Sequence, residues 1–436
     1  MATLLQMSPE AFIRFLKQNK IRRFHFVFNF AENKVIPSHK VLQPIADFLM
    51  ADQRDFDKHE GIFFQITNKH DALQAGFVHK TNRGNAAGGT RFWPYRSMED
   101  FLRDGLRLSK GMTRKNALAG LWWGGGKGVV AQSENLDIHN QEQRRDIFKE
   151  YGELMSAIRG VYITAEDVGT NPQDIAHIFS ETRFSTCIPP ALGGSGNPSE
   201  PTATGVIRGM EAALRFMDGG TIEGRTIAIQ GMGHVGEPLI RMLLEKGAKK
   251  IIACDIKQEN IDFVLKSCGS DRLESSLVEI GDNSILFTEC DVLAPCATGA
   301  ILNPDTIPRL NTKIVCGAAN NQLEDGLRDD DALFARGILY VPDFLVNRMG
   351  IVNCANEQYG YIPNDPYKLR HLETEWEHSI FHVTFKILQI SREQGEPPAH
   401  TAIRLADVQA EHVHPIFGHR GLDIIKSLVE DKWFEE

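Results

Sequence analysis

The chain has 436 residues, of which 42% are hydrophobic and 24% are charged, and its formal net charge is −9. This length predicts a globular protein with more than one domain. The negative charge excludes the basic surface that nucleic-acid binding requires, and no apolar run approaches the ~20 residues of a membrane span. The opening segment, MATLLQMSPEAFIRFLKQNK, lacks the features of a secretory or transit peptide, which favours a cytoplasmic location. We therefore expect small-molecule partners, no nucleic acid and no membrane.

Residues 1–60 combine a helix-like opening, the alternating apolar run RRFHFVFNF and a polar segment. They predict either a packing appendage or an oligomer contact, and the sequence does not distinguish the two. From Gly61, the runs GIFFQI and AGFVHK alternate as strands do. The segment TNRGNAAGGTRFWPYRS is interpreted as a glycine-rich connection into a helix from Ser97 to about Arg114.

Two lysines, twelve residues apart, flank a stretch that should be buried. Leu108, Met112 and Lys115 are spaced four and three residues apart, so Lys115 should share the inward face of its helix with apolar side chains. Lys127 follows an apolar run and three glycines, where missing side chains let backbone or a ligand approach. Burial and a neighbouring cation both lower the pKa of a lysine, and a value near ~7–8 would suit a base. The alternative is a solvated lysine in an ordinary glycine turn.

A helix is predicted from about Gln141 to Ile158, with an apolar stripe at helical spacing made of Ile147, Tyr151, Leu154, Met155 and Ile158. It precedes the predicted strand VYITAE, which ends at Asp167. In an α/β domain, a carboxylate at the end of a strand projects toward a cleft. The alternative for this aspartate is an N-cap or a turn before Gly169. Together with the two lysines, its position favours a catalytic role.

A change in composition marks the predicted domain boundary. Residues 187–205 concentrate proline, glycine, serine and threonine. A helix from about Val206 to Met217 leads to the strand TIAIQ, a G-x-G-x-x-G motif, a second helix and the strand IIACD. The motif residues are Gly231, Gly233, His234, Val235 and Gly236.

This order of strand, glycine turn, helix and strand is typical of a dinucleotide site, because the first turn of the helix offers N–H groups to the pyrophosphate. Asp255, nineteen residues after the last glycine, is positioned to accept hydrogen bonds from the adenosine ribose. Its charge would repel the 2′-phosphate of NADP, so NAD is the expected cofactor, and Lys257 leaves some ambiguity. The runs DVLAP, TKIVCGA and GILYVP then predict further strands of a doubly wound sheet.

Neither cysteines nor histidines form a convincing metal-ligand pattern. The seven cysteines have no C-x-x-C spacing and are interpreted as reduced core residues. His412 and His414 form the tightest histidine pair, and a surface or capping role is favoured for them over a metal site. We predict no metal.

Several ordered motifs together resemble those of the glutamate, leucine, phenylalanine and valine dehydrogenase family, and the leucine branch is the most similar. They are GGTR, GMTRKNALAGLWWGGGKGVV, YITAEDVG and FLVNRMGIVNCANEQYGY, and the resemblance covers roughly Phe64 to Tyr361. It implies an α/β fold in which a cleft separates a substrate and oligomerisation domain from a Rossmann-type domain. The first would span residues 1–200, completed by C-terminal helices in 345–436, and the second 201–344. A homo-oligomer, dimer or larger, is also implied.

The resemblance assigns roles to individual residues. Lys115 would hold the substrate α-carboxylate, Lys127 would be the catalytic amine, and Asp167 would exchange protons with the amino nitrogen. Other substrate contacts would be Gly88, Gly89, Met112, Ala87, Ile351 and Cys354. The cofactor contacts beyond the glycine motif would be Thr202, Ala294, Asn320 and Asn347. The alternative for the loop asparagines is a turn-forming role.

The resemblance also implies the reaction, NAD-dependent oxidative deamination of an L-amino acid to its 2-oxo acid and ammonia, and the reverse. Glutamate-specific members carry a lysine before the glycine pair and a serine at a second position, where this chain has Ala87 and Cys354. Burying a glutamate side chain there without a cation would be unfavourable. The expected substrate is therefore apolar, either branched-chain or aromatic.

One segment departs from the family pattern, because Asn347 is followed by Arg348, Met349 and Gly350 in place of Ala-Gly-Gly. The bulky side chains must either turn away, with Arg348 pairing with a surface or interdomain carboxylate, or narrow the cleft. A narrowed cleft would favour a second hypothesis, a catalytically impaired NAD-binding regulatory or assembly protein. A third hypothesis, a hydroxy-acid dehydrogenase, is disfavoured because no histidine base lies near the lysines.

Overall fold

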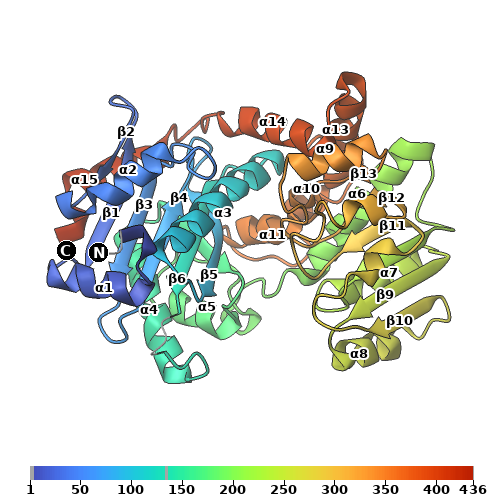
Figure 1. The fold of residues 1–436 in the computed structure, drawn as a ribbon, viewed down its shortest axis with the longest axis horizontal. Helices are drawn as coiled ribbons and strands as arrows, with labels where there is room; N and C mark the ends of the chain where they lie inside the picture. The colour runs from blue at the N-terminus through green and yellow to red at the C-terminus, as the bar shows by residue number, and fades with distance from the viewer. Residues whose placement is uncertain (1–3, 133–135, 436) are drawn as a thin grey trace. The chain divides into compact units, whose positions relative to one another are not determined.

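A computed structural model describes residues 4–132 and 136–435, which form two compact units, each built around its own sheet (Figure 1). Unit 1 comprises Met1–Asn197, Glu357–Tyr361 and Asp407–Glu436, and unit 2 comprises Pro198–Asn356 and Ile362–Ala406. No helix among the described residues has the length and apolar character needed to cross a bilayer. The α/β class predicted from the sequence is confirmed.

The sheet of unit 1 has seven strands in the order β2-β1-β3-β4-β6-β5-β7. Pairing is antiparallel from β2 through β6, whereas β5 runs parallel to both β6 and β7. The strands are β1 (Arg23–Asn29), β2 (Lys34–Pro37), β3 (Gly61–Ile66), β4 (Leu73–Val78), β5 (Ala86–Trp93), β6 (Gly124–Ala131) and β7 (Tyr162–Glu166). The parallel part, β6-β5-β7, carries the residues predicted to be catalytic.

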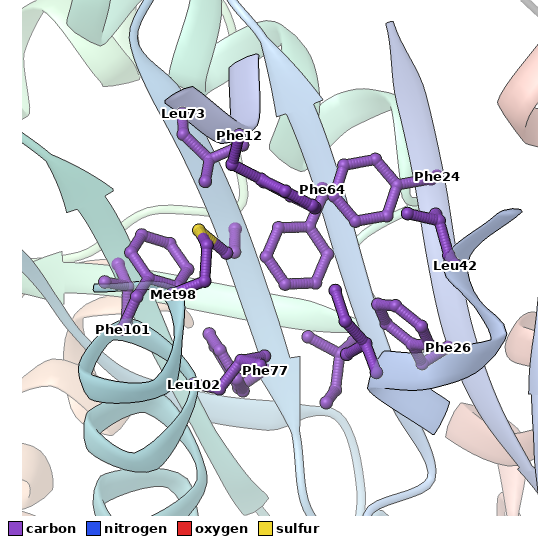
Figure 2. Packing of buried hydrophobic residues seen from close by; sticks show 14 of the residues in the cluster. Phe12, Phe24, Phe26, Leu42, Phe64, Leu73, Phe77, Met98, Phe101 and Leu102 are labelled. Atoms are coloured by element: carbon purple, nitrogen blue, oxygen red, sulfur yellow. The ribbon is translucent and has the colours of Figure 1, made fainter. Parts of the chain in front are cut away.

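Residues 1–60 belong to the core of unit 1. Helix α1 (Pro9–Gln18) begins at Ser8, whose hydroxyl accepts from Ala11 N at 3.3 Å, and helix α2 is Gln43–Ala51. Aromatic side chains from α1, β1 and β3 interlock, as Figure 2 shows, and the rings of Phe24 and Phe64 stack 4.4 Å apart. Burial of such rings is among the largest apolar contributions to folding. The structure thus shows that this region packs into the core of unit 1, and a role in oligomer contacts stays a prediction.

Three further helices of unit 1 begin at side-chain caps. Ser97 Oγ accepts from Asp100 N at 3.1 Å, and Asn140 and Asn171 cap in the same way. These three residues precede α3 (Met98–Leu118), α4 (Gln141–Ala157) and α5 (Pro172–Phe179), and α15 (Arg420–Glu430) completes the unit. The apolar stripe predicted for α4 is confirmed, since Ile147, Tyr151, Leu154, Met155 and Ile158 are all buried.

The interpretation of residues 81–97 as a connection is wrong, because β5 lies within this segment. Alanine and glycine have low β propensity, but tertiary context outweighs propensity in a central strand. Here β5 is hydrogen-bonded on both sides, to β6 and to β7. The small residues let both neighbouring strands approach closely.

The sheet of unit 2 has six strands in the order β10-β9-β8-β11-β12-β13, and every pair is parallel. This order is that of a doubly wound dinucleotide-binding fold. The strands are β8 (Thr226–Gln230), β9 (Lys250–Asp255), β10 (Leu273–Leu277), β11 (Cys290–Pro295), β12 (Thr312–Val315) and β13 (Leu339–Tyr340). The predicted strands are present, and only the edge strand β10 was not expected.

The helices of unit 2 are α6 (Ser199–Asp218), α7 (Gly236–Glu245), α8 (Gln258–Cys268), α9 (Arg328–Ala335), α10 (Asp343–Val346), α11 (Met349–Glu357), α12 (Pro366–Arg370), α13 (Ile380–Gln394) and α14 (Pro398–Ala410). Helix α6 begins earlier than the predicted Val206. Pro201 lies in its first turn, where the missing N–H costs nothing, so the proline-rich composition did not prevent a helix. Helix α13 packs against α6, with the rings of Phe216 and Phe385 6.0 Å apart.

Candidate active site

The two residues predicted to be catalytic, Lys127 and Asp167, meet in unit 1. Lys127 lies in the middle of β6, and Asp167 directly follows β7, on the other side of β5. Lys127 Nζ donates to Asp167 Oδ2 at 2.5 Å. The lysine side chain is 6% exposed and the aspartate side chain 18%. The pair is therefore largely shielded from water, while the carboxylate retains an open side.

The predicted glycine pair on β5 makes this meeting possible. A Cβ atom on Gly88 would lie 2.0 Å from Gly126 O, and one on Gly89 would lie 2.6 Å from the Cβ atom of Asp167. The Tyr162 hydroxyl, which is buried, donates to Gly88 O at 2.7 Å. Because these glycines lack side chains, β5 can lie between Lys127 and Asp167, the two residues predicted to be catalytic, without blocking their contact.

The glycine triplet allows a similarly close approach of helix α3 to the sheet. A Cβ atom on Gly125 would lie 2.2 Å from Thr113 N and 2.4 Å from Ser109 O, so helix α3 lies directly on β6. Asn116 Nδ2 donates to Gly124 O at 2.6 Å and ties the helix to the strand. The space beside Gly125 is therefore filled by the main chain of α3 and not left for a ligand. The alternative of a turn with a solvated lysine is wrong, because residues 124–131 form a buried strand.

The predicted inward face of α3 needs a correction. The buried residues facing the sheet are Leu102, Leu106, Ser109, Thr113 and Asn116, whereas Leu108, Met112 and Lys115 are half-buried along one flank. The polar residues on this face, such as Thr113, can be buried because they have hydrogen-bond partners there. Thr113 Oγ1, for example, is hydrogen-bonded to His79 Nδ1 at 2.7 Å.

This flank still adjoins the glycine pair. A Cβ atom on Gly88 would lie 3.0 Å from Met112 Cγ, so Met112 covers the strand at that point. Lys115 follows Met112 on the same flank of the helix, where it is half-buried.

The electrostatic surroundings favour an ionised Asp167. Burial alone would raise the pKa of its carboxyl, but the charges of Lys127 and Arg91 outweigh burial and lower the pKa below its ordinary value. The Asp167 N–H donates to Thr170 Oγ1 at 2.9 Å, which fixes the turn after β7. Asp167 is thus a carboxylate held in a defined place, able to accept a proton.

Sequence reasoning missed Arg91 as part of this group. Its Nε lies 3.4 Å from Asp167 Oδ2, and its Nη1 donates to Asp104 at 3.0 and 3.1 Å. The signal was present, because side chains in a strand alternate between faces and Arg91 lies two residues after Gly89. Without the assignment of residues 86–93 to a strand, that periodicity could not be applied.

In unit 2, the three motif glycines have three different environments. Gly231 has φ +96°, which side chains rarely adopt, and a Cβ atom on Gly236 would lie 2.0 Å from Gly231 O. A Cβ atom on Gly233 would meet nothing nearer than Asn260 Nδ2 at 4.0 Å. A dinucleotide-binding turn requires a tight turn at its first glycine, an open approach for the ligand at its second and a close helix contact at its third. His234 and Val235 lie between the second and third, just before α7.

Asp255 ends β9 and faces the glycine turn. Its Oδ2 accepts from Met232 N at 2.7 Å, and its Oδ1 accepts from Lys257 N at 2.8 Å and Asn260 Nδ2 at 3.1 Å. A carboxylate can accept about four hydrogen bonds, so capacity remains for a ribose hydroxyl. Lys257 is exposed at the start of α8. These residues fit a dinucleotide cofactor.

The other predicted cofactor residues also lie in unit 2. Asn347 Nδ2 donates to Asn320 Oδ1 at 2.8 Å and to Ala318 O at 3.1 Å, so the two asparagines are joined. Ala294 is fully buried within β11, and Thr202 lies in α6, 9% exposed. The residues predicted around the substrate side chain are divided between the units, with Ala87 buried in β5 and with Ile351 and Cys354 buried in α11.

Arg348 and Met349 are both fully buried within unit 2. Arg348 donates through Nη2 to the main-chain oxygen of His378, and burial lowers the pKa of its guanidinium to about 9. Met349 packs on α6, where a Cβ atom on Gly205 would lie 3.1 Å from its Cγ. Because Arg348 is fully buried, a surface carboxylate is excluded as its partner, and pairing with an interdomain carboxylate stays a prediction.

Comparisons with known proteins give consistent results. A family model described as Glu/Leu/Phe/Val dehydrogenase, dimerisation domain, matches residues 64–184, and one described as Glutamate/Leucine/Phenylalanine/Valine dehydrogenase matches residues 193–408. The chain is 40% identical to a leucine dehydrogenase of Bacillus subtilis (strain 168) over 77% of this chain and 87% of that protein. It is 38% identical to a phenylalanine dehydrogenase of Lysinibacillus sphaericus over 69% of this chain and 77% of that protein. The structure of L-tryptophan dehydrogenase from Nostoc punctiforme is similar with a TM-score of 0.66 and 32% identity, covering 81% of this chain and 96% of that one.

Proposed function

We propose that this chain, which belongs to the Glu/Leu/Phe/Val dehydrogenase family of enzymes acting on CH–NH2 groups, catalyses the reversible NAD-dependent oxidative deamination of an apolar L-amino acid. The amino acid, NAD⁺ and water give the 2-oxo acid, ammonium ion and NADH, with release of one proton when the amino group enters as an ammonium. The observation that best supports the proposal is the shielded Lys127 and Asp167 pair, with Nζ and Oδ2 2.5 Å apart. The family membership confirms the resemblance inferred from the sequence motifs.

Substrate binding begins with the α-carboxylate. Lys115, half-buried on the flank of α3, would pair with it, and Met112 beside the glycine pair would contact the atoms around Cα. Fixing the carboxylate restricts the rotation of Cα, which supplies much of the advantage of an enzyme-bound reaction. Bound nicotinamide would accept the hydride from Cα.

Proton transfers would fall to Asp167 and Lys127. The ionised Asp167 carboxylate would take a proton from the substrate ammonium, leaving a neutral amine that can donate electron density as the hydride departs. Lys127, once it has released its own proton, would take a proton from the water that adds to the iminium carbon as the carbon–oxygen bond forms. When the carbon–nitrogen bond breaks, Asp167 would return a proton to the departing nitrogen, and the hydroxyl proton would pass to the released ammonia, leaving the 2-oxo acid and an ammonium ion.

Cofactor binding would use the glycine turn of unit 2. Gly233, which has open space beside it, would face the pyrophosphate at the start of α7, and Asp255 would accept from the adenosine ribose. A 2′-phosphate would bring negative charge against this carboxylate, so NAD is preferred over NADP. Asn320 and Asn347, already hydrogen-bonded to each other, would lie at the nicotinamide half.

The substrate side chain should be apolar. Ala87 and Cys354 are uncharged and buried, so they offer no cation to a glutamate side chain. Leaving a buried carboxylate unpaired would cost several kcal/mol, on the order of 3–5. Ala87 is also small, which leaves room for a larger aliphatic or an aromatic group.

The test is an NAD-reduction assay over the standard L-amino acids at alkaline pH, with Asp167→Asn as the inactive control. We expect kcat/KM to be highest for an apolar amino acid among leucine, valine, phenylalanine and tryptophan, and lower for glutamate. Binding of NADH without turnover of any amino acid would instead select the regulatory hypothesis, and turnover of hydroxy acids alone would select the third. Light scattering on the same preparation would test the proposal that the chain forms a homo-oligomer, which the described dimerisation domain supports.

A further inference from the structure

Arg91 lies between two carboxylates that come from different elements. Its Nη1 donates to both carboxylate oxygens of Asp104, on α3, at 3.1 and 3.0 Å, and its Nε lies 3.4 Å from Asp167 Oδ2. Asp104 also accepts from the Tyr95 hydroxyl at 2.7 Å and from Arg107 Nη2 at 3.1 Å. Arg91 therefore connects helix α3 to the carboxylate that follows β7.

We propose that Arg91 is a positioning residue that holds the Asp167 carboxylate during the proton transfers, while Asp104 and Tyr95 hold the guanidinium. The inference rests on the proposed function, in which Lys127 must turn from Asp167 to the substrate and water. Lys127 Nζ and Arg91 Nε approach the same oxygen, at 2.5 and 3.4 Å. When the lysine leaves, Arg91 remains as the cation that keeps the carboxylate in place.

An unused donor supports this role. Among the residues that the structure describes, Arg91 Nε is buried and makes no hydrogen bond. Its contact with Asp167 at 3.4 Å is an ion pair outside hydrogen-bond geometry. A buried donor without an acceptor is unfavourable, so a small movement of Asp167 toward Arg91 would gain a hydrogen bond. The structure thus offers Asp167 a second partner.

The shape of the guanidinium suits this task better than an ammonium would. Its planar group has donors at Nε and at both Nη atoms, so it can face Asp104 and Asp167 at the same time, whereas the compact ammonium of a lysine would serve one of them. The Arg91 side chain is 21% exposed and that of Asp104 is 12% exposed, so both are held by their surroundings. The other charged groups around Asp167 are Lys127, from β6, and the adjacent Glu166, whose pKa burial raises.

Arg107 provides a matched control. It contacts the same Asp104 from the same helix, but its side chain is 51% exposed, and its described ion pair is with Asp104 alone. Arg107→Gln therefore removes an arginine of the Asp104 cluster without removing a partner of Asp167. Arg91→Gln removes both contacts, and Arg91→Lys keeps a charge that can serve only one carboxylate.

The first measurement does not need turnover. The carboxyl of Asp167 is titrated by carbon-13 NMR, with its resonance assigned by its loss in Asp167→Asn. Arg91→Gln should raise the pKa of Asp167, because one of the two cations that lower it is gone, and Arg107→Gln should leave it unchanged. An unchanged titration in Arg91→Gln, or the same change in both variants, would overturn the proposal.

The second measurement is the pH dependence of turnover. Arg91→Gln should lower kcat by about 10- to 100-fold, as expected for a misplaced catalytic group, with cofactor affinity unchanged and the acid limb moved to higher pH. Arg91→Lys should recover part of kcat. If Arg91→Gln fails to fold, Asp104→Asn should give a smaller change in the same direction. Absence of turnover in the unaltered protein would contradict the proposed function, and the NMR titration would still decide the role of Arg91.

Discussion

Replacing Gly125 by alanine would test whether the close contact of α3 with β6 builds the site. The added Cβ atom would lie 2.0 Å from Thr113 Oγ1, 2.2 Å from Thr113 N and 2.4 Å from Ser109 O. Two of these three atoms belong to the main chain of the helix, so a side-chain rotation cannot relieve the overlap. The helix must retreat by about 1 Å to reach ordinary contact distances.

The magnitude follows from the contacts that such a retreat disturbs. Overpacking of this kind costs ~1–3 kcal/mol, and weakening the bond from Asn116 Nδ2 to Gly124 O adds ~0.5–1.5 kcal/mol, so the free energy of unfolding should fall by ~2–4 kcal/mol. Because α3 carries Lys115, the same displacement should lower kcat/KM by about 100-fold.

Urea denaturation and steady-state kinetics measure the two effects. Gly111→Ala is the matched control, because it lies in the same helix and a Cβ atom there would have nothing within 4 Å. That substitution should stabilise the protein by up to ~1 kcal/mol through helix propensity alone. A Gly125→Ala protein with the stability and kcat/KM of the unaltered chain would refute the reasoning.

Three further predictions concern single side chains. Lys127→Ala should lower kcat by several orders of magnitude while NADH binding, followed by fluorescence, is unchanged, and near-normal kcat would contradict its role. Asp255→Ser should reduce the ratio of kcat/KM with NAD to kcat/KM with NADP. Equal kcat/KM with the two cofactors in the unaltered protein would disprove the role of Asp255 in this preference. Burial and the charge of His39 lower the pKa of His25 to about 4, so the unfolded state binds its proton more tightly and stability falls as the pH drops below about 6.5. Between pH 7 and pH 5, the free energy of unfolding measured by urea denaturation should fall by ~2 kcal/mol less in His25→Phe than in the unaltered protein. An equal fall in both proteins would show that His25 is not the cause.

The burial of Arg348 and Met349 bears on the choice between an enzyme and a regulatory protein. The regulatory hypothesis arose because two bulky side chains replace small ones in a motif that the family resemblance places near the reaction. Both side chains lie inside unit 2, with Met349 against α6 and Arg348 bonded to the His378 carbonyl. Their size therefore gives no support to that hypothesis, and the turnover assay decides it directly.

Local patterns in the sequence predicted the parts of the fold whose cause is local. The apolar spacing of α4 and the order of β8, the glycine turn, α7 and β9 could be read directly, because a helix or strand that buries one face must repeat its apolar residues with the period of its own backbone. The position of Asp167 directly after β7 was predicted from the apolar run that forms the strand, since a buried strand ends where its apolar run ends.

The tertiary structure decided what depends on close approach between distant segments. Residues 86–93 form a central strand because β6 and β7 pair with them on either side, and no short window of sequence contains all three strands. The contact of Arg91 with Asp167, seventy-six residues later, depends on the same pairing. The later part of the inner face of α3 is polar for the same reason, because Thr113 bonds to His79, directly after β4, and Asn116 bonds to Gly124 on β6. Hydrophobic periodicity reports which face of an element avoids water, whereas a buried polar group is stabilised by a specific partner, and only the folded chain brings that partner within reach.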